Sequence, residues 1–80
     1  MIYIKAYTKT HSFNFTADDR FNENQDAKIF DTLSKSDFNH VCMIAQAEFD
    51  RVVHVDAIAA TIDKDGEVSE GIIFSRTLNV

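Results

Sequence analysis

The chain has 80 residues, is 45% hydrophobic, and carries a net charge of −5 from thirteen acidic and eight basic residues. This length allows one domain (residues 1–80) with a single core, and the hydrophobic content excludes an intrinsically disordered chain. The Lys and Arg residues are scattered along the sequence. Direct nucleic-acid binding is therefore not expected, because it depends on clustered positive charge.

The cysteine content and the N-terminus indicate the compartment. Cys42 is the one cysteine, so neither an intramolecular disulfide nor a thiolate-rich zinc site can form. The N-terminal sequence does not resemble a secretory signal, and no apolar run is long enough to span a bilayer. We therefore expect a cytoplasmic protein, in the host cytoplasm if it is viral, without a membrane partner. Glycine-rich phosphate loops are absent, and no cofactor is expected.

The N-terminal quarter of the chain has the pattern of a hairpin. Residues 2–9 (IYIKAYTK) and 12–17 (SFNFTA) both alternate with a period of two and are rich in β-branched or aromatic residues. This alternation predicts two strands that meet at a turn. The polar residues 17–26 that follow predict a loop.

One or two helices are predicted in the middle of the chain. The first is capped by Asp26 and ends at Leu33. The second covers residues 36–50 and is capped by Ser36 or Asp37; a strand is the alternative for this segment. Helical spacing turns one set of apolar side chains toward the core in each helix. These sets are Ile29, Phe30 and Leu33 in the first, and Phe38, Val41, Cys42, Ala45 and Phe49 in the second.

The C-terminal segments predict a second hairpin. Residues 51–62 and 67–78 are rich in β-branched side chains and flank the dipeptide Asp65-Gly66. Asp-Gly favours a two-residue type I′ turn, which would pair Lys64 with Glu67. A calcium loop is not expected, because the glycine is at the wrong position for an EF-hand. With the N-terminal hairpin and the helices, this predicts an α+β fold with an antiparallel sheet.

Counting outward from that turn gives a hairpin that is apolar on both faces. One face carries Ala57, Ala59, Ile72 and Phe74, and the other carries Ile58, Ile62 and Ile73. A sheet exposed on one side should instead alternate apolar with polar residues. The second face must then be covered by the N-terminal strands, by a second chain or by a ligand. We predict a homodimer that associates through Ile58, Ile62 and Ile73.

The same register brings a polar cluster together near one end of the hairpin. His54 is expected opposite Thr77, and Asp56 opposite Ser75. A small hydrolase that uses His54, Asp56 and Ser75 is one hypothesis for this cluster. His40 and Cys42 would join it as metal ligands only if residues 36–50 formed a strand; as a helix, they diverge. No metal site is therefore predicted.

Three functions from different classes are compatible with the sequence. The leading hypothesis is a small acidic binding protein that blocks or sequesters another protein without catalysis. Phage-encoded inhibitors of host defence proteins share this size and charge, which makes an anti-defence role an analogy of those two properties alone. The second hypothesis is a site for a nucleotide-like anion at a dimer interface, and the hydrolase is the third. The residues proposed for binding are Tyr3, Lys5, Tyr7, Arg76, His54 and Asp56.

Overall fold

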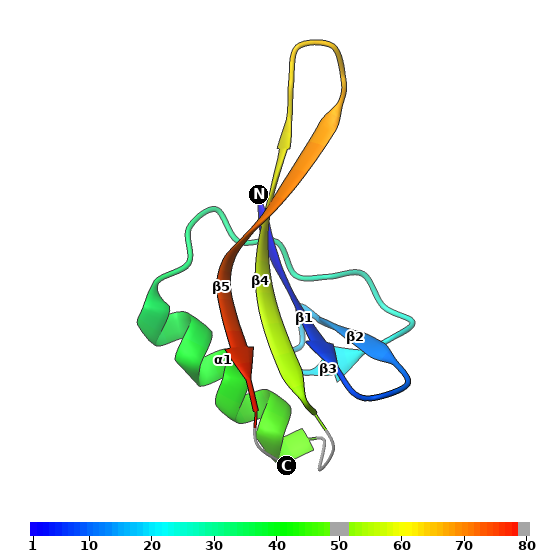
Figure 1. Ribbon diagram of the computed structural model, residues 1–80, viewed down its shortest axis with the longest axis vertical. Coiled ribbons are helices and arrows are strands. Elements are labelled where there is room, and N and C mark those ends of the chain that lie inside the picture. The colour runs from blue at the N-terminus through cyan, green and yellow to red at the C-terminus, as the bar shows by residue number, and fades with distance from the viewer. Residues whose placement is uncertain (49–51, 79–80) are drawn as a thin grey trace.

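The computed structural model describes residues 1–48 and 52–78, which form an antiparallel sheet with one helix (Figure 1). The elements in chain order are β1 (Ile2–Tyr7), β2 (Ser12–Phe15), β3 (Phe21–Asn22), α1 (Lys35–Glu48), β4 (His54–Ile62) and β5 (Val68–Thr77). The spatial order of the strands is β3-β2-β1-β4-β5. The predicted α+β fold is therefore confirmed, with β1 at the centre of the sheet and β5 at one edge. Within the described residues, no helix has the length and apolarity needed to cross a membrane.

The two hairpins join edge to edge through β1 and β4. Ile4 pairs with Ala57, and Ala6 pairs with Val55, in an antiparallel ladder. These four side chains are fully buried and belong to the core between the sheet and α1. The N-terminal strands therefore widen the sheet and do not cover its second face, so one of the three coverings expected from the sequence is ruled out.

Helix α1 covers one face of the sheet with the apolar stripe that the sequence predicts. Phe38, Val41, Cys42 and Ala45 are buried, and the ring of Phe38 stacks on that of Phe74 with centroids 5.3 Å apart. The predicted stripe member Phe49 lies outside the described residues. The helix begins one residue earlier than expected, and neither Ser36 nor Asp37 is its cap. Ser34 is the N-cap, because its Oγ accepts a hydrogen bond of 3.1 Å from the N–H of Asp37.

The helix predicted for residues 26–33 is not formed. Phe30 instead makes an isolated bridge to Ile2, in which its N–H donates to one carbonyl and its own carbonyl accepts, at 2.8 and 2.9 Å. The N–H of Lys28 donates to the carbonyl of Phe15 at 2.7 Å. These bonds hold the segment extended against the sheet, which leaves Ile29 51% exposed and not in the core. Tertiary pairing has outweighed a short amphipathic pattern here.

The turn between β4 and β5 is at the predicted place but has a different form. Gly66 has a φ of 82°, whereas Asp65 is not among the residues with positive φ, so the turn is not type I′. Three residues, 64–66, separate Asp63 from Glu67, whose backbones are joined by a 3.0 Å hydrogen bond. The Asp63 carboxylate accepts the N–H groups of Asp65 and Glu67, both at 2.9 Å. This side-chain bonding favours the three-residue loop, so the expected Lys64–Glu67 pair is wrong.

The longer loop shifts the strand register by one residue, and a β-bulge restores it. Near the turn, Ile58 pairs with Ile72; beyond the bulge, Ala57 pairs with Phe74, as predicted. Ile73 is the extra residue. Ile72 therefore shares a face with Ile58 and Ile62, not with Ala57 and Phe74. The prediction that this hairpin is apolar on both faces is wrong above the bulge, where Ala59, Thr61, Ser69 and Gly71 occupy the other face.

Candidate functional site

The face of the sheet turned away from α1, the outer face, holds most of the residues proposed for binding. Along β1, Tyr3, Lys5 and Tyr7 alternate with the buried Ile4 and Ala6. The β1–β4 ladder pairs Lys5 with Asp56 and Tyr7 with His54, and paired residues share a face. Five of the six proposed residues are thus together on this face.

Arg76 is separate from the other five. It pairs with the buried Val55, and its guanidinium donates a hydrogen bond to the Asn39 side chain of α1. This places Arg76 on the helix side of the sheet. A site for a nucleotide-like anion on the outer face of one chain would therefore have Lys5 but not Arg76 as a cation.

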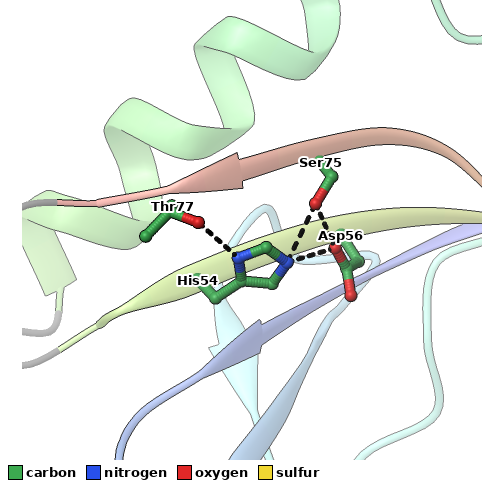
Figure 2. Close-up of polar contacts among 4 residues, drawn as sticks. All are labelled: His54, Asp56, Ser75 and Thr77. Carbon is green, nitrogen blue, oxygen red and sulfur yellow. Dashed lines mark hydrogen bonds and ion pairs between the residues drawn. The ribbon is translucent and has the colours of Figure 1, made fainter.

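The predicted polar cluster forms at the end of the β4–β5 hairpin (Figure 2). His54 lies opposite Thr77 and Asp56 opposite Ser75, as the sequence predicts. The Nε2 atom of His54 is 2.5 Å from Oδ1 of Asp56 and 2.9 Å from Oγ of Ser75, which in turn donates to that Oδ1 at 2.8 Å. The Nδ1 atom is 3.2 Å from Oγ1 of Thr77.

These contacts do not give Ser75 a general base. A carboxylate only accepts hydrogen bonds, so the 2.5 Å contact to Asp56 requires a proton on Nε2 of His54. The same nitrogen then cannot take the proton of Ser75. In a hydrolytic triad the acid and the nucleophile contact opposite nitrogens of the histidine. Among the described residues, Thr77 is the one on the opposite nitrogen, so the His54–Asp56–Ser75 cluster does not have the arrangement of a hydrolytic triad.

The tyrosines of the outer face are partly desolvated and adjoin carboxylates. Burial, together with the hydrogen bond that its hydroxyl donates to Glu70 at 3.1 Å, raises the pKa of Tyr3 above its ordinary value of 10.0. Burial and then the charge of Asp56 raise the pKa of Tyr7. Both hydroxyls are therefore held in the protonated form. Glu70 and Asp56 also make this part of the face negative, which is unfavourable for an anionic ligand.

The second candidate feature is a projecting arm. Every residue from 61 to 73, here called the arm, is exposed, and Figure 1 shows this end of the hairpin projecting beyond the body of the domain. Seven large hydrophobic side chains are exposed in the described residues, and four of them belong to the arm. These four are Ile62, Val68, Ile72 and Ile73. Exposed apolar side chains concentrated in this way are typical of interaction surfaces.

Three of the four, here called the stripe, lie along one face of the arm (Ile62, Val68 and Ile72), with Glu70 between Val68 and Ile72 on that face. Ile62 pairs with Val68, and Ile72 pairs with Ile58, so all of them share the outer face. The exposed fractions of the stripe are 63%, 59% and 61%. Ile58, one of the three residues predicted for self-association, is only 8% exposed and is already covered within the chain.

The sequence did not single out Val68 or Ile72 for this surface. The sequence pattern places Val68 in a strand without marking it as exposed, and the count from a two-residue turn puts Ile72 on the opposite face because that count omits the bulge at Ile73. The signal available in the sequence was Asp63, whose side chain favours a longer loop than Asp65-Gly66 alone requires.

Because residues 35–48 form the predicted helix and not the alternative strand, the metal-ligand candidates His40 and Cys42 are separated. His40 is exposed on α1, whereas Cys42 is buried and its thiol is free. Burial raises the pKa of that thiol above its ordinary value of 9.0, and the nearby Arg76 lowers it less strongly. Among the residues that the structure describes, no group of three or more His, Cys, Asp or Glu side chains is arranged to hold a metal.

A groove of about 180 Å³ is present on the helix side of the sheet. Its lining includes the aromatic rings of Phe15 and Phe30, with the Lys28 ammonium over both rings at 5.7 and 5.3 Å. Lys28 also forms an ion pair of 2.8 Å with Asp19. Because its one ammonium group is already engaged by two rings and a carboxylate, this groove offers an anionic ligand little unpaired positive charge.

The chain matches no protein-family model, no curated protein and no solved structure. The case for a function therefore rests on the side chains of the outer face and the arm.

Proposed function

We propose that this chain is a small binding protein that acts without catalysis, by covering part of another protein. The observation that carries the proposal is the apolar stripe on the exposed arm, since a chain with one short core gains no stability from three isoleucine or valine side chains left in water. Tyr3 extends this surface, because it pairs with Ile58 at the base of the arm. Tyrosine is favoured in recognition surfaces for its large contact area.

The stripe alone supplies only part of the binding energy. Burying an aliphatic side chain completely contributes about 1.5–3 kcal/mol, so three side chains that are roughly 60% exposed contribute about 3–5 kcal/mol together. A dissociation constant of about 1 mM already corresponds to roughly 4 kcal/mol. A useful affinity therefore requires additional contacts from Tyr3 and from the polar residues of the arm.

The setting proposed for this activity is the cytoplasm, where a free, buried thiol such as that of Cys42 stays reduced. An inhibitor that blocks a larger protein is the form of this function that suits a short acidic chain, and phage-encoded inhibitors of host defence proteins have that form. The anion-site alternative is less well supported, because Arg76 is on the other face and carboxylates adjoin the tyrosines.

Affinity capture with a stripe variant tests the proposal. The variant Ile62→Thr/Val68→Thr/Ile72→Thr keeps β-branched residues in the strands but removes the apolar surface. The matched control, Ile29→Thr/Met43→Gln, removes two exposed apolar side chains elsewhere. We expect the natural chain and the control to capture the same protein, and the stripe variant to lose it. Equal capture by the stripe variant would show that the arm is not the contact surface.

A further inference from the structure

The charge of the arm is as unevenly distributed as its apolar surface. Residues 61–73 contain four carboxylates (Asp63, Asp65, Glu67 and Glu70) and one cation, Lys64. Four negative charges and one positive charge give −3, out of −5 for the whole chain. More than half of the net charge is therefore carried by thirteen consecutive residues.

Two of these carboxylates have no partner within the described part of the chain. The carboxylate of Asp63 is used by the turn, and that of Glu70 accepts the Tyr3 hydroxyl. The carboxylates of Asp65 and Glu67 form neither a hydrogen bond nor an ion pair among residues 1–48 and 52–78. They are at the tip of the arm, close in sequence to Ile62 and Val68, but strand alternation places Glu67 on the face opposite the stripe, so they lie at the rim of a surface that covers the stripe.

We propose that the occupant of the stripe is a protein surface with an apolar groove rimmed by Lys and Arg side chains, the kind of groove that also holds nucleic-acid phosphates. The proposal rests on the binding function above and names the partner's chemistry. Its apolar part would cover Ile62, Val68 and Ile72, while the cations at its rim would approach Asp65 and Glu67 at the tip of the arm. Charge complementarity of this kind speeds association and rejects partners of the wrong sign.

A second copy of the chain fits the same surface less well. Two sheet faces pack about 10 Å apart, which is close to the screening length of roughly 8 Å at physiological ionic strength. Two arms that packed along their stripes would therefore place charges of −3 and −3 against each other with incomplete screening. Ile58, the third residue of the predicted dimer interface, is already buried and adds little to it.

Three short synthetic peptides serve as probes of this chemistry. One alternates leucine with lysine, one alternates leucine with glutamate, and one alternates serine with lysine. Binding to the full isotopically labelled chain is followed by amide chemical shifts, at low and at physiological ionic strength. We expect the leucine–lysine peptide to bind, with the shift changes concentrated in residues 61–73. The leucine–glutamate peptide should not bind, and the serine–lysine peptide should bind more weakly.

Charge-neutralising variants locate the effect. The variant Asp65→Asn/Glu67→Gln should bind the leucine–lysine peptide roughly two- to twentyfold more weakly at low ionic strength, and its affinity should depend less on salt. The matched control Glu23→Gln/Asp26→Asn removes the same charge beyond β3, at the opposite edge of the sheet, and should leave the affinity unchanged.

The outcomes separate this inference from the binding function itself. Three results would overturn the inference that the partner is basic. They are no binding of the leucine–lysine peptide, equal binding of the leucine–glutamate peptide, and equal effects of the two neutralised variants. The binding function would still stand if the stripe variant lost its captured protein. Sedimentation of the natural chain as a dimer, with the stripe variant as a monomer of 9.1 kDa, would identify a second copy as the occupant and also overturn the inference.

Discussion

Ile58 lies opposite Ile72, while its neighbour Ala57 lies opposite Phe74, so Ile73 has no residue of its own to pair with on β4. This bulge has two consequences. It keeps Phe74 against Phe38 in the core, and it places Ile72 on the outer face with the rest of the stripe. Bulges also increase the local twist of a strand pair, in agreement with the crossing of β5 over β4 near the base of the arm (Figure 1).

Deletion of Ile73 should be tolerated. Without the extra residue, Ile72 and Phe74 are consecutive and still pair with Ile58 and Ala57, so no side chain changes face. We expect the free energy of unfolding, measured by urea denaturation, to change by about 1 kcal/mol or less. Deletion of Ser75 is the control: it forces Phe74 out of the core, and the loss should be about 3 kcal/mol or more. Equal losses in both variants would contradict the assignment of Ile73 as the extra residue.

The turn of the arm gives a second prediction. Asp63→Ala removes the acceptor of two backbone hydrogen bonds and should destabilise the arm by about 1–3 kcal/mol. Asp65→Ala removes a carboxylate of the same charge that has no such role, and should have little effect. Amide hydrogen exchange of residues 61–69 measures the effect of each substitution on the stability of the arm. Faster exchange in Asp65→Ala than in Asp63→Ala would mean that the Asp63 side chain does not define the loop.

The start of α1 gives a third prediction. Ser34→Ala should destabilise the protein by about 1 kcal/mol, because its hydroxyl accepts the N–H of Asp37 at the beginning of the helix. Ser36→Ala changes the same residue type within the first turn and should be close to neutral. Thermal unfolding of the two variants side by side distinguishes them. The opposite order would support a helix that begins after Ser36.

The sequence predicted the parts of the fold that depend on local pattern. The alternation in the N-terminal strands, the stripe of α1 and the pairing of His54 with Thr77 all appear in the structure. Each of these depends on side chains within one element or on the strand register that a nearby turn sets. The polar cluster was predicted for the same reason, since its register below the bulge coincides with that of the expected two-residue turn.

The errors arose where distant backbone groups compete with local pattern. Phe30 exchanges hydrogen bonds with Ile2, about one third of the chain away, and this pairing replaces the helix expected for residues 26–33. The face of Ile72 depends on a bulge that compensates for a turn several residues distant. Neither relation has a periodic signature, and so periodicity could not reveal the stripe on the arm.

Alkaline conditions should destabilise the protein. The pKa values of Tyr3, Tyr7 and Cys42 are raised in the folded state, chiefly by burial, so folding favours their protonated forms. This contribution is complete below their ordinary values, 9.0 for the thiol and 10.0 for the tyrosines, and is lost as the pH rises through the raised values. Urea unfolding from about pH 8 to about pH 11 should show a falling free energy, with a shallower fall in Tyr3→Phe and in Cys42→Ala. If both variants leave the slope of the free energy of unfolding against pH unchanged, other groups cause the loss of stability.

The polar cluster should contribute stability and not activity. In His54→Ala, the carboxylate of Asp56, which is 8% exposed, loses one of the two side-chain donors that it has among the described residues and keeps Ser75. The free energy of unfolding should fall by about 1–3 kcal/mol, while capture of the partner and binding of the leucine–lysine peptide persist. Thr77→Val, which removes only the hydroxyl on the other nitrogen of His54, should cost less. If His54→Ala and Thr77→Val both fold and both lose a hydrolytic activity that the natural chain displays, the cluster is catalytic with Thr77 as the nucleophile, and the binding function is not the whole of what this chain does.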